Sequence, residues 1–168
     1  SRYHPEVLRL FMLQSHYRSP VDFSEDSLKE ARAALIRGYT ALQALKEAKK
    51  QAGNQDVGGQ RESGSDEAGR WDEFVSKFDM ALDDDFNTAQ ALGYVFEAAR
   101  QANQIAAAGK KMPDAALRAQ LDIAAGAFVH FGNVLGVFQS DPDEFFMADR
   151  SIEAGKSGLD VSWVEMMI

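Results

Sequence analysis

The side chains best suited to chemistry in this sequence are its three histidines, His4, His16 and His130. None of them has a second histidine or a glutamate at the HxxxH or HExxH spacing that places two metal ligands on one helix face. The sequence contains no cysteine, which excludes a thiolate nucleophile, a disulfide framework and any zinc site built on sulfur. Because aromatic and aliphatic residues flank His130, we interpret it as a core or helix-face residue in preference to a metal ligand.

A run of three aspartates, Asp83, Asp84 and Asp85, offers enough carboxylate oxygens to hold Mg²⁺ or Ca²⁺. An EF-hand loop would require alternating ligands and a distal glutamate, which this segment lacks. The run instead precedes Asn87, and Gln90 follows three residues later in the pattern of a capping box. Because carboxylates are favourable near a helix N-terminus, we predict that Asp85 and Asn87 cap the next helix, with a metal site as the less favoured alternative.

No other segment predicts a catalytic centre. The sequence contains neither a Gly-x-Ser-x-Gly nucleophile elbow, nor a phosphate-binding loop, nor a dinucleotide fingerprint. The residues alone therefore indicate a domain that does no chemistry of its own.

The charge of the sequence is negative overall and uneven along the chain. The net charge of −8 argues against general affinity for nucleic acids, because phosphate binding depends on Lys and Arg. Residues 1–52, however, carry nine Lys or Arg against six Asp or Glu, whereas residues 53–168 carry nine against twenty. A solvated helix face is the default interpretation of the basic residues near the N-terminus, and a phosphate-facing surface is the alternative. These residues are Arg2, Arg9, Arg18, Lys29, Arg32 and Arg37.

The elements that must position these side chains are helices. Apolar residues recur at steps of three and four along most of the chain, and no strand-like alternation of useful length occurs. The pattern and its capping residues predict helices over residues 5–17, 24–53, 71–82, 87–109 and 113–138. We therefore expect an all-α protein, an antiparallel bundle of four to five long helices around one core.

Two stretches fall outside this pattern. Residues 53–70 are rich in Gly, Ser and charged residues, which favours a mobile loop. A turn is expected at residues 141–142, and a last helix is expected to begin at Asp160 or Ser162. Its amphipathic pattern reaches Ile168 without a capping residue, so we expect the natural sequence to continue.

The sequence also lacks features of membrane and secreted proteins. No stretch approaches the roughly 20 apolar residues of a membrane span, and the first residues do not form a signal peptide. We therefore expect a cytoplasmic protein without a membrane partner.

Two segments resemble a known family. Residues 4–20, His-Pro-Glu-Val-Leu-Arg-Leu-Phe-Met-Leu-Gln-Ser-His-Tyr-Arg-Ser-Pro, are similar to the passage of bacterial cysteinyl-tRNA synthetases that leaves the catalytic domain and opens a helical domain. Within them residues 6–9, Glu-Val-Leu-Arg, resemble the Asp-Ala-Leu-Arg motif for which this class of anticodon-binding domain is named, with both the acid and the Ala replaced. Residues 78–88, Phe-Asp-Met-Ala-Leu-Asp-Asp-Asp-Phe-Asn-Thr, resemble the family's Met-x-x-Asp-Asp-Phe-Asn-Thr stretch. The resemblance covers about residues 3–140.

The resemblance implies an ATP-dependent ligase that attaches cysteine to its tRNA, and for this chain the fold of a class Ia anticodon-binding domain. It assigns the HIGH-type and KMSKS-type ATP motifs and a zinc-bound cysteine pocket to a preceding catalytic domain. An anticodon-reading domain is expected beyond residue 168. This chain alone is then expected to have no activity and to bind neither zinc nor ATP. Its expected partners are tRNA and the two neighbouring domains, in a monomeric enzyme.

Under this resemblance the chain divides into three parts. Residues 1–22 are expected to form a linker helix from the catalytic domain, residues 23–140 a tRNA-stem-binding bundle, and residues 141–168 a tail toward the C-terminal domain. Two other functions stay open: a cysteine-activating ligase with a small-molecule acceptor, and a helical protein-interaction scaffold without RNA affinity.

The resemblance also suggests which side chains act. His16 and Tyr17 are expected to pack against the catalytic domain. Arg9 lies on an apolar helix, so a structural role in which it holds a carboxylate is favoured for it. The candidates for contacts with the RNA backbone or with the catalytic domain are Arg9, Arg18, Lys29, Arg32 and Arg37.

Overall fold

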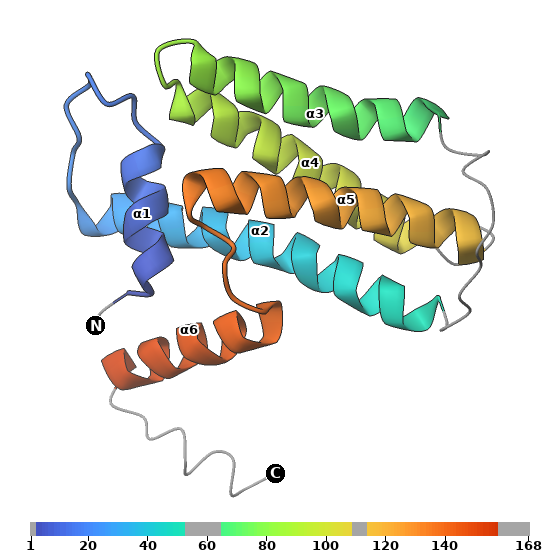
Figure 1. Cartoon of the computed structure of the whole chain (residues 1–168). Coiled ribbons are helices and arrows are strands. Elements are labelled where there is room, and N and C mark those ends of the chain that lie inside the picture. The colour runs from blue at the N-terminus through green and yellow to red at the C-terminus, as the bar shows by residue number, and fades with distance from the viewer. Residues whose placement is uncertain (1–2, 53–64, 109–113, 158–168) are drawn as a thin grey trace, which may run out of the picture.

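The computed structural model describes residues 3–52, 65–108 and 114–157, and every regular element in these ranges is a helix (Figure 1). The helices are α1 (Pro5–Leu13), α2 (Glu25–Gln51), α3 (Ser65–Asp83), α4 (Thr88–Ala108), α5 (Asp114–Leu135) and α6 (Pro142–Ser157). The predicted all-α class is therefore confirmed.

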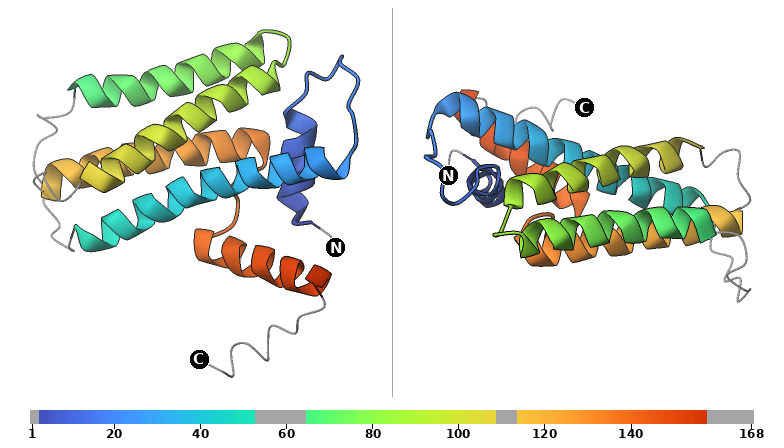
Figure 2. Two further views of the ribbon diagram at one scale, coloured as in Figure 1. Left: turned by 180° about the vertical axis from the view of Figure 1, so that it is seen from behind. Right: turned by 90° about the horizontal axis from the view of Figure 1, so that it is seen from above.

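Four long helices, α2 to α5, form a bundle in which successive helices alternate in direction (Figure 1). Within the bundle α4 contacts α2, α3 and α5, and α5 contacts α2 and α3. The short helix α1 crosses one end of the bundle against α2 and α4, and α6 lies beside α2 outside the other long helices (Figures 1 and 2). The core consists of aromatic and aliphatic side chains from all six helices, the largest being Trp71, Tyr39, Phe78, Phe128, Phe131 and Phe145.

Capping side chains explain where several helices begin. The ring Nδ1 of His4 accepts a hydrogen bond from the backbone N–H of Glu6 at 3.3 Å, and Pro5 occupies the first position of α1. Ser24 caps α2 by accepting from the N–H of Ser27 at 3.1 Å. The starts of α1 and α2 are thus set by residues that bind backbone N–H groups which the helix itself leaves without partners.

The helix boundaries differ from the prediction in three places. α1 ends at Leu13, earlier than predicted, and the residues that follow it run across the end of the bundle. α3 begins at Ser65, so residues 65–70 are helical although their Gly and Ser content favoured a loop. α5 ends at Leu135, where Gly136 adopts a positive φ of 66°. Residues 53–64 lie outside the described residues, as does the helix expected from residue 160.

α6 begins where a turn was expected, at residues 141–142. Pro142 was expected in a turn, but it occupies the first turn of a helix, where its missing N–H has no partner to lose. Asp143 and Glu144 follow at the positive end of the helix dipole. The helix was missed because most of its apolar contact with the bundle comes through Phe145 and Phe146, too few residues to show a periodic stripe.

None of the described helices is long and apolar enough to span a lipid bilayer.

Candidate functional site

The two segments that carry the family resemblance meet in the structure, at Asp85. The hydroxyl of Tyr17 donates a hydrogen bond to Asp85 Oδ1 at 2.7 Å. The guanidinium of Arg18 lies 2.8 Å from Asp85 Oδ2, and the ring Nε2 of His16 lies 3.8 Å from the same oxygen. Three consecutive side chains after α1 therefore converge on one carboxylate in the turn between α3 and α4.

The turn between α3 and α4 places this carboxylate. Asp85 and Phe86 both adopt left-handed backbone conformations, with φ of 56° and 53°. The N–H of Phe86 donates to Leu82 O at 3.0 Å and that of Asn87 to Ala81 O at 3.0 Å, which closes the end of α3. Such conformations are costly for residues other than glycine and persist only where neighbouring contacts fix them.

Asn87 begins the next helix from the same turn. Its Oδ1 accepts a hydrogen bond from the N–H of Gln90 at 3.1 Å, and its Nδ2 donates to the Gln90 side chain at 3.1 Å. Asp85, in contrast, directs its carboxylate toward the segment after α1, where Tyr17 and Arg18 bind it. Asn87 thus acts as the cap, whereas Asp85 joins two parts of the fold.

The polar cluster changes the acidity of Tyr17. The hydrogen bond from its hydroxyl to Asp85 raises the pKa of Tyr17 above the usual 10.0. His16 stacks on the Tyr17 ring with centroids 4.7 Å apart, and the Arg18 guanidinium lies 5.2 Å from the centroid of that ring. The ring is held on the surface, where 59% of Tyr17 is exposed.

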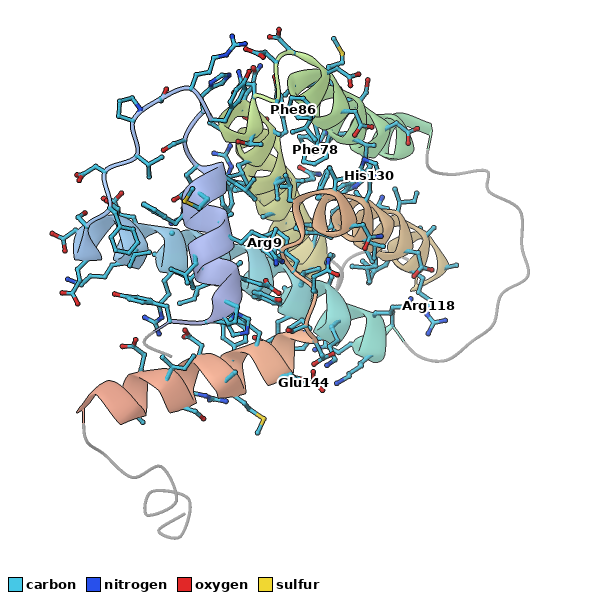
Figure 3. All side chains as sticks on the ribbon, turned by 60° about the vertical axis from the view of Figure 1, so that its left-hand side comes forward. Arg9, Phe78, Phe86, Arg118, His130 and Glu144 are labelled. Carbon is cyan, nitrogen blue, oxygen red and sulfur yellow. The ribbon has the colours of Figure 1, made fainter. Side chains whose placement is uncertain are left out.

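An apolar pocket of about 400 Å³ adjoins this cluster. It lies between the end of α1 and the α3–α4 turn, and its lining consists of Met12, Leu13, Ser15, Tyr17, Phe86 and Thr88. Phe86 is 70% exposed and Met12 59%, although both are large apolar side chains (Figure 3 shows Phe86 at this end of the bundle). Grouped exposed apolar residues of this kind are typical of a surface that contacts another molecule or domain.

Two of the five predicted arginine and lysine candidates hold the fold together. Arg9 Nη1 donates a hydrogen bond to the carbonyl of Gly136, so its partner is the end of α5 and not a carboxylate. Arg32 forms a two-pronged pair with Asp149 on α6, with Nε–Oδ1 and Nη2–Oδ2 distances of 2.8 and 2.6 Å. Asp149 is only 7% exposed in its side chain, so this pair is largely removed from solvent.

The other three candidates are on the surface. Arg18 is 68% exposed and Lys29, which pairs with Asp26 at 2.9 Å, is 63% exposed. The guanidinium of Arg37 lies 5.3 Å from the centroid of the Phe96 ring. The structure brings only Arg18 together with His16 and Tyr17, while Lys29 and Arg37 lie apart from them along α2.

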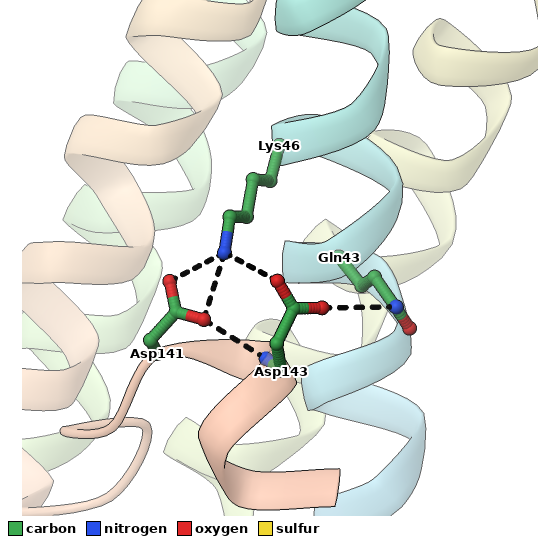
Figure 4. A network of polar contacts seen from close by, with 4 residues as sticks. All are labelled: Gln43, Lys46, Asp141 and Asp143. Atoms are coloured by element: carbon green, nitrogen blue, oxygen red, sulfur yellow. Dashed lines mark hydrogen bonds and ion pairs between the residues drawn. The ribbon is translucent and has the colours of Figure 1, made fainter.

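Three further polar contacts between helices have no local signature in the sequence. Lys46 on α2 lies 2.7 Å from both Asp141 and Asp143 at the start of α6, and Gln43 also reaches Asp143 (Figure 4). His130 on α5 pairs with Asp79 on α3 at 2.8 Å. The third contact is made by Glu6, whose side chain is buried. The partners lie from 33 to 133 residues apart in the chain, so no local spacing predicts them.

The described residues contain no group of three or more His, Cys, Asp or Glu side chains arranged to hold a metal ion. Of the three consecutive aspartates, Asp85 accepts a hydrogen bond from Tyr17 and forms an ion pair with Arg18.

Comparison with known proteins identifies the segment. Residues 77–139 match the family model of the DALR domain. The cysteine–tRNA ligase of Stutzerimonas stutzeri (strain A1501) is 42% identical over 167 residues, which are 99% of this chain and 30% of that protein. The chain belongs to the cysteine–tRNA ligase family. The ligase of Geobacter sulfurreducens is 41% identical over 99% of this chain and 33% of its own length, and that of Pseudomonas aeruginosa (strain LESB58) is 39% identical over 99% and 30%.

The chain spans about a third of the length of these ligases. The DALR match begins in α3 and ends at Gln139, after α5, so it contains the Asp85 turn and excludes α1, α2 and α6. α1 and the residues that follow it nevertheless contact the matched part of the chain in two places. Tyr17 binds Asp85 in the α3–α4 turn, and Arg9 binds the carbonyl of Gly136.

Proposed function

We propose that this helical domain holds tRNA in position while a catalytic domain of the same ligase attaches cysteine. The observation that carries the proposal is the similarity to cysteine–tRNA ligases over 99% of the chain, at 42% identity in one of them. The DALR domain match over residues 77–139 supports the tRNA-binding part of it. A packed bundle suits this role because its interior is dense and transmits position rigidly.

We take Arg18, Lys29 and Arg37 as the candidates for contact with the RNA backbone. An exposed ion pair contributes little to stability, so Arg18 and Lys29 can exchange a carboxylate for a phosphate at small cost. Arg37 is exposed, and its guanidinium lies over the ring of Phe96. Arg9 and Arg32 are tied to α5 and α6 and are assigned to the fold instead. Because A-form RNA is recognised through its backbone and shape, no base-reading motif is required.

We assign the contact with the catalytic domain to the surface at the end of α1. There Tyr17 lines the apolar pocket with His16 stacked on its ring, and Phe86 and Met12 are exposed in the same lining. We assign zinc and ATP to that other domain, and this chain has no cysteine that could supply a thiolate ligand to zinc. We place the enzyme in the cytoplasm as a monomer, and the segment after α6 leads to its anticodon-reading domain.

The test is steady-state kinetics of the intact parent ligase in which Arg18, Lys29 and Arg37 are all replaced by Ala. We expect the KM for tRNA to rise by about tenfold or more at moderate salt, with a weaker salt dependence, because fewer counterions are released on binding. Cysteine activation, measured by ATP–pyrophosphate exchange without tRNA, should stay unchanged.

A matched variant with Lys50→Ala, Arg100→Ala and Arg150→Ala removes the same charge from other exposed positions. An equal effect of both variants would show a general charge effect and contradict the assigned residues. If the intact ligase charges a small molecule instead of tRNA, or if neither variant changes tRNA binding, the proposed function is wrong.

A further inference from the structure

Glu6 is a buried carboxylate that holds the backbone between α5 and α6. Only 5% of Glu6 is exposed. Its oxygens accept hydrogen bonds from the N–H of Phe138 at 2.8 Å and from the N–H of Gln139 at 3.1 Å. The Tyr39 hydroxyl lies 3.1 and 3.0 Å from the same two oxygens. Hydrogen bonds to an ionised acceptor are stronger than neutral ones, and here the acceptor is removed from solvent.

Arg9 acts on the same stretch of backbone from one helical turn further along α1. It donates to the carbonyl of Gly136, while Glu6 accepts from the N–H groups two and three residues later. A cation is favourable at this position because Gly136 follows the C-terminal end of α5. Glu6 thus binds the N–H groups and Arg9 the carbonyl of one short backbone segment. We call Glu6 and Arg9, together with residues 136–139, the α1 clasp.

α2 also packs against this segment. A Cβ atom on Gly38 would lie 2.3 Å from Cε1 of Phe138, so only glycine leaves room for the ring of Phe138. Phe138 adopts a φ of 59°, a left-handed conformation that needs support from its surroundings. The Tyr39 hydroxyl also accepts a hydrogen bond from the N–H of Ser140 at 3.2 Å.

The orientation of α6 follows from this segment. Phe145, in the first turns of α6, stacks on the Tyr39 ring with centroids 3.8 Å apart, and His4 meets Phe145 edge-on at 5.1 Å. Lys46 holds Asp141 and Asp143 at the start of the helix (Figure 4). The residues that lead into α1 and the start of α6 are therefore in direct contact.

We propose that Glu6 and Arg9 are positioning residues that fix α6 relative to α1. Through them, the part of the ligase that precedes α1 and the part that follows α6 keep one mutual orientation while both contact a tRNA. The second statement rests on the proposed function above. The first concerns this chain alone and can be tested without RNA.

The first experiment measures the position of α6 by electron–electron resonance between two spin labels. Because the chain has no cysteine, Leu8→Cys on α1 and Ser151→Cys on α6 provide two unique labelling sites, both exposed. We expect one narrow distance distribution in the otherwise unchanged chain and a clearly broader one after Glu6→Gln. Glu47→Gln makes the same chemical change at an exposed position of α2 and should leave the distribution narrow.

Two milder variants guard against loss of folding in Glu6→Gln, which circular dichroism would reveal. Arg9→Met removes the bond to Gly136 and Tyr39→Phe removes one donor to Glu6, while each keeps an apolar body in place. Both should broaden the distribution to a smaller extent. Distributions as narrow as that of Glu47→Gln in every folded variant would overturn the proposal.

The second experiment uses the intact ligase and separates positioning from mere stability. Glu6→Gln should raise the KM for tRNA by about tenfold, the equivalent of one charge-assisted hydrogen bond, with ATP–pyrophosphate exchange unchanged. An equal loss of both activities would indicate a structural role only and would overturn the second statement. If the proposed function alone were wrong, Glu6→Gln would still broaden the distance distribution, so the two failures can be told apart.

Discussion

The hydroxyl of Tyr17 donates a hydrogen bond to Asp85, 68 residues further along the chain, at 2.7 Å. This bond joins the segment after α1 to the turn between α3 and α4, the two regions in which the resemblance to cysteinyl-tRNA synthetases was found. Arg18 shares the same carboxylate at 2.8 Å. The two motifs therefore form one surface feature at the end of the bundle beside an exposed apolar pocket.

Asp85→Asn should lower the pKa of Tyr17 toward the usual 10.0, because the hydrogen bond to the carboxylate is what raises it. Asn tolerates the left-handed backbone at this position, so the turn should persist. Absorbance titration of the phenolate, with Tyr17→Phe subtracted, isolates this group from the other three tyrosines. Asp84→Asn, on the same exposed turn, is the control, and an unchanged Tyr17 titration in Asp85→Asn would refute the assignment.

The stability of the same variant should change by less than about 1 kcal/mol, because exposed ion pairs contribute little. Chemical unfolding of Asp85→Asn against the unchanged chain measures this. A loss several times larger would mean that the Asp85 cluster holds the fold and is not mainly a surface feature.

Arg32→Ala should destabilise the fold by about 2–4 kcal/mol, because it leaves the carboxylate of Asp149 largely buried without its cation. Lys29→Ala, one turn earlier on α2, removes an exposed pair with Asp26 and should cost no more than about 0.5 kcal/mol. Urea unfolding of both variants makes the comparison. Equal costs would show that the two-pronged contact between α2 and α6 contributes no more than a surface pair.

Much of the fold could be predicted because its helices carry their own signals. The apolar stripe of α2, the Ser24 cap and the Asn87–Gln90 capping pattern are all local in the sequence. α6 was missed for the opposite reason. It is held by the stack of Phe145 on Tyr39 and by the pair of Arg32 with Asp149, and both contacts join residues more than 100 positions apart.

The polar contacts of the candidate site show the same limit. The sequence identified Arg9, Arg18 and Arg32 as basic residues of interest, but their partners are a backbone carbonyl, a turn aspartate and a buried aspartate on other helices. Glu6 was part of the resemblance to the Asp-Ala-Leu-Arg motif, yet nothing local shows that its carboxylate accepts from Phe138 and Gln139. Which side chain meets which is decided by how the helices pack.

Tyr39 should make the fold sensitive to alkaline pH. Burial raises the pKa of Tyr39 well above the usual 10.0. The unfolded chain loses this proton near pH 10 while the folded chain retains it, so the stabilisation is complete below pH 10 and declines as the pH rises above it. Urea unfolding between pH 8 and about pH 11 should show this decline, and Tyr39→Phe should flatten it. Tyr94→Phe, a half-exposed tyrosine on α4, serves as the control and should keep the decline.

Two glycines on helices should respond in opposite directions to the same substitution. A Cβ at Gly38 would lie 2.3 Å from the ring of Phe138, whereas nothing lies within 4 Å of a Cβ at Gly93 on α4. Gly93→Ala should therefore stabilise the protein by about 0.5–1 kcal/mol, because alanine is the better helix former. Gly38→Ala gains the same preference but must displace Phe138 from the α1 clasp, so we expect a net loss of about 1–3 kcal/mol. Urea unfolding measures both values. If Gly38→Ala were as stable as Gly93→Ala, Phe138 could leave its place freely, and the segment that joins α5 to α6 would not be held as the structure indicates.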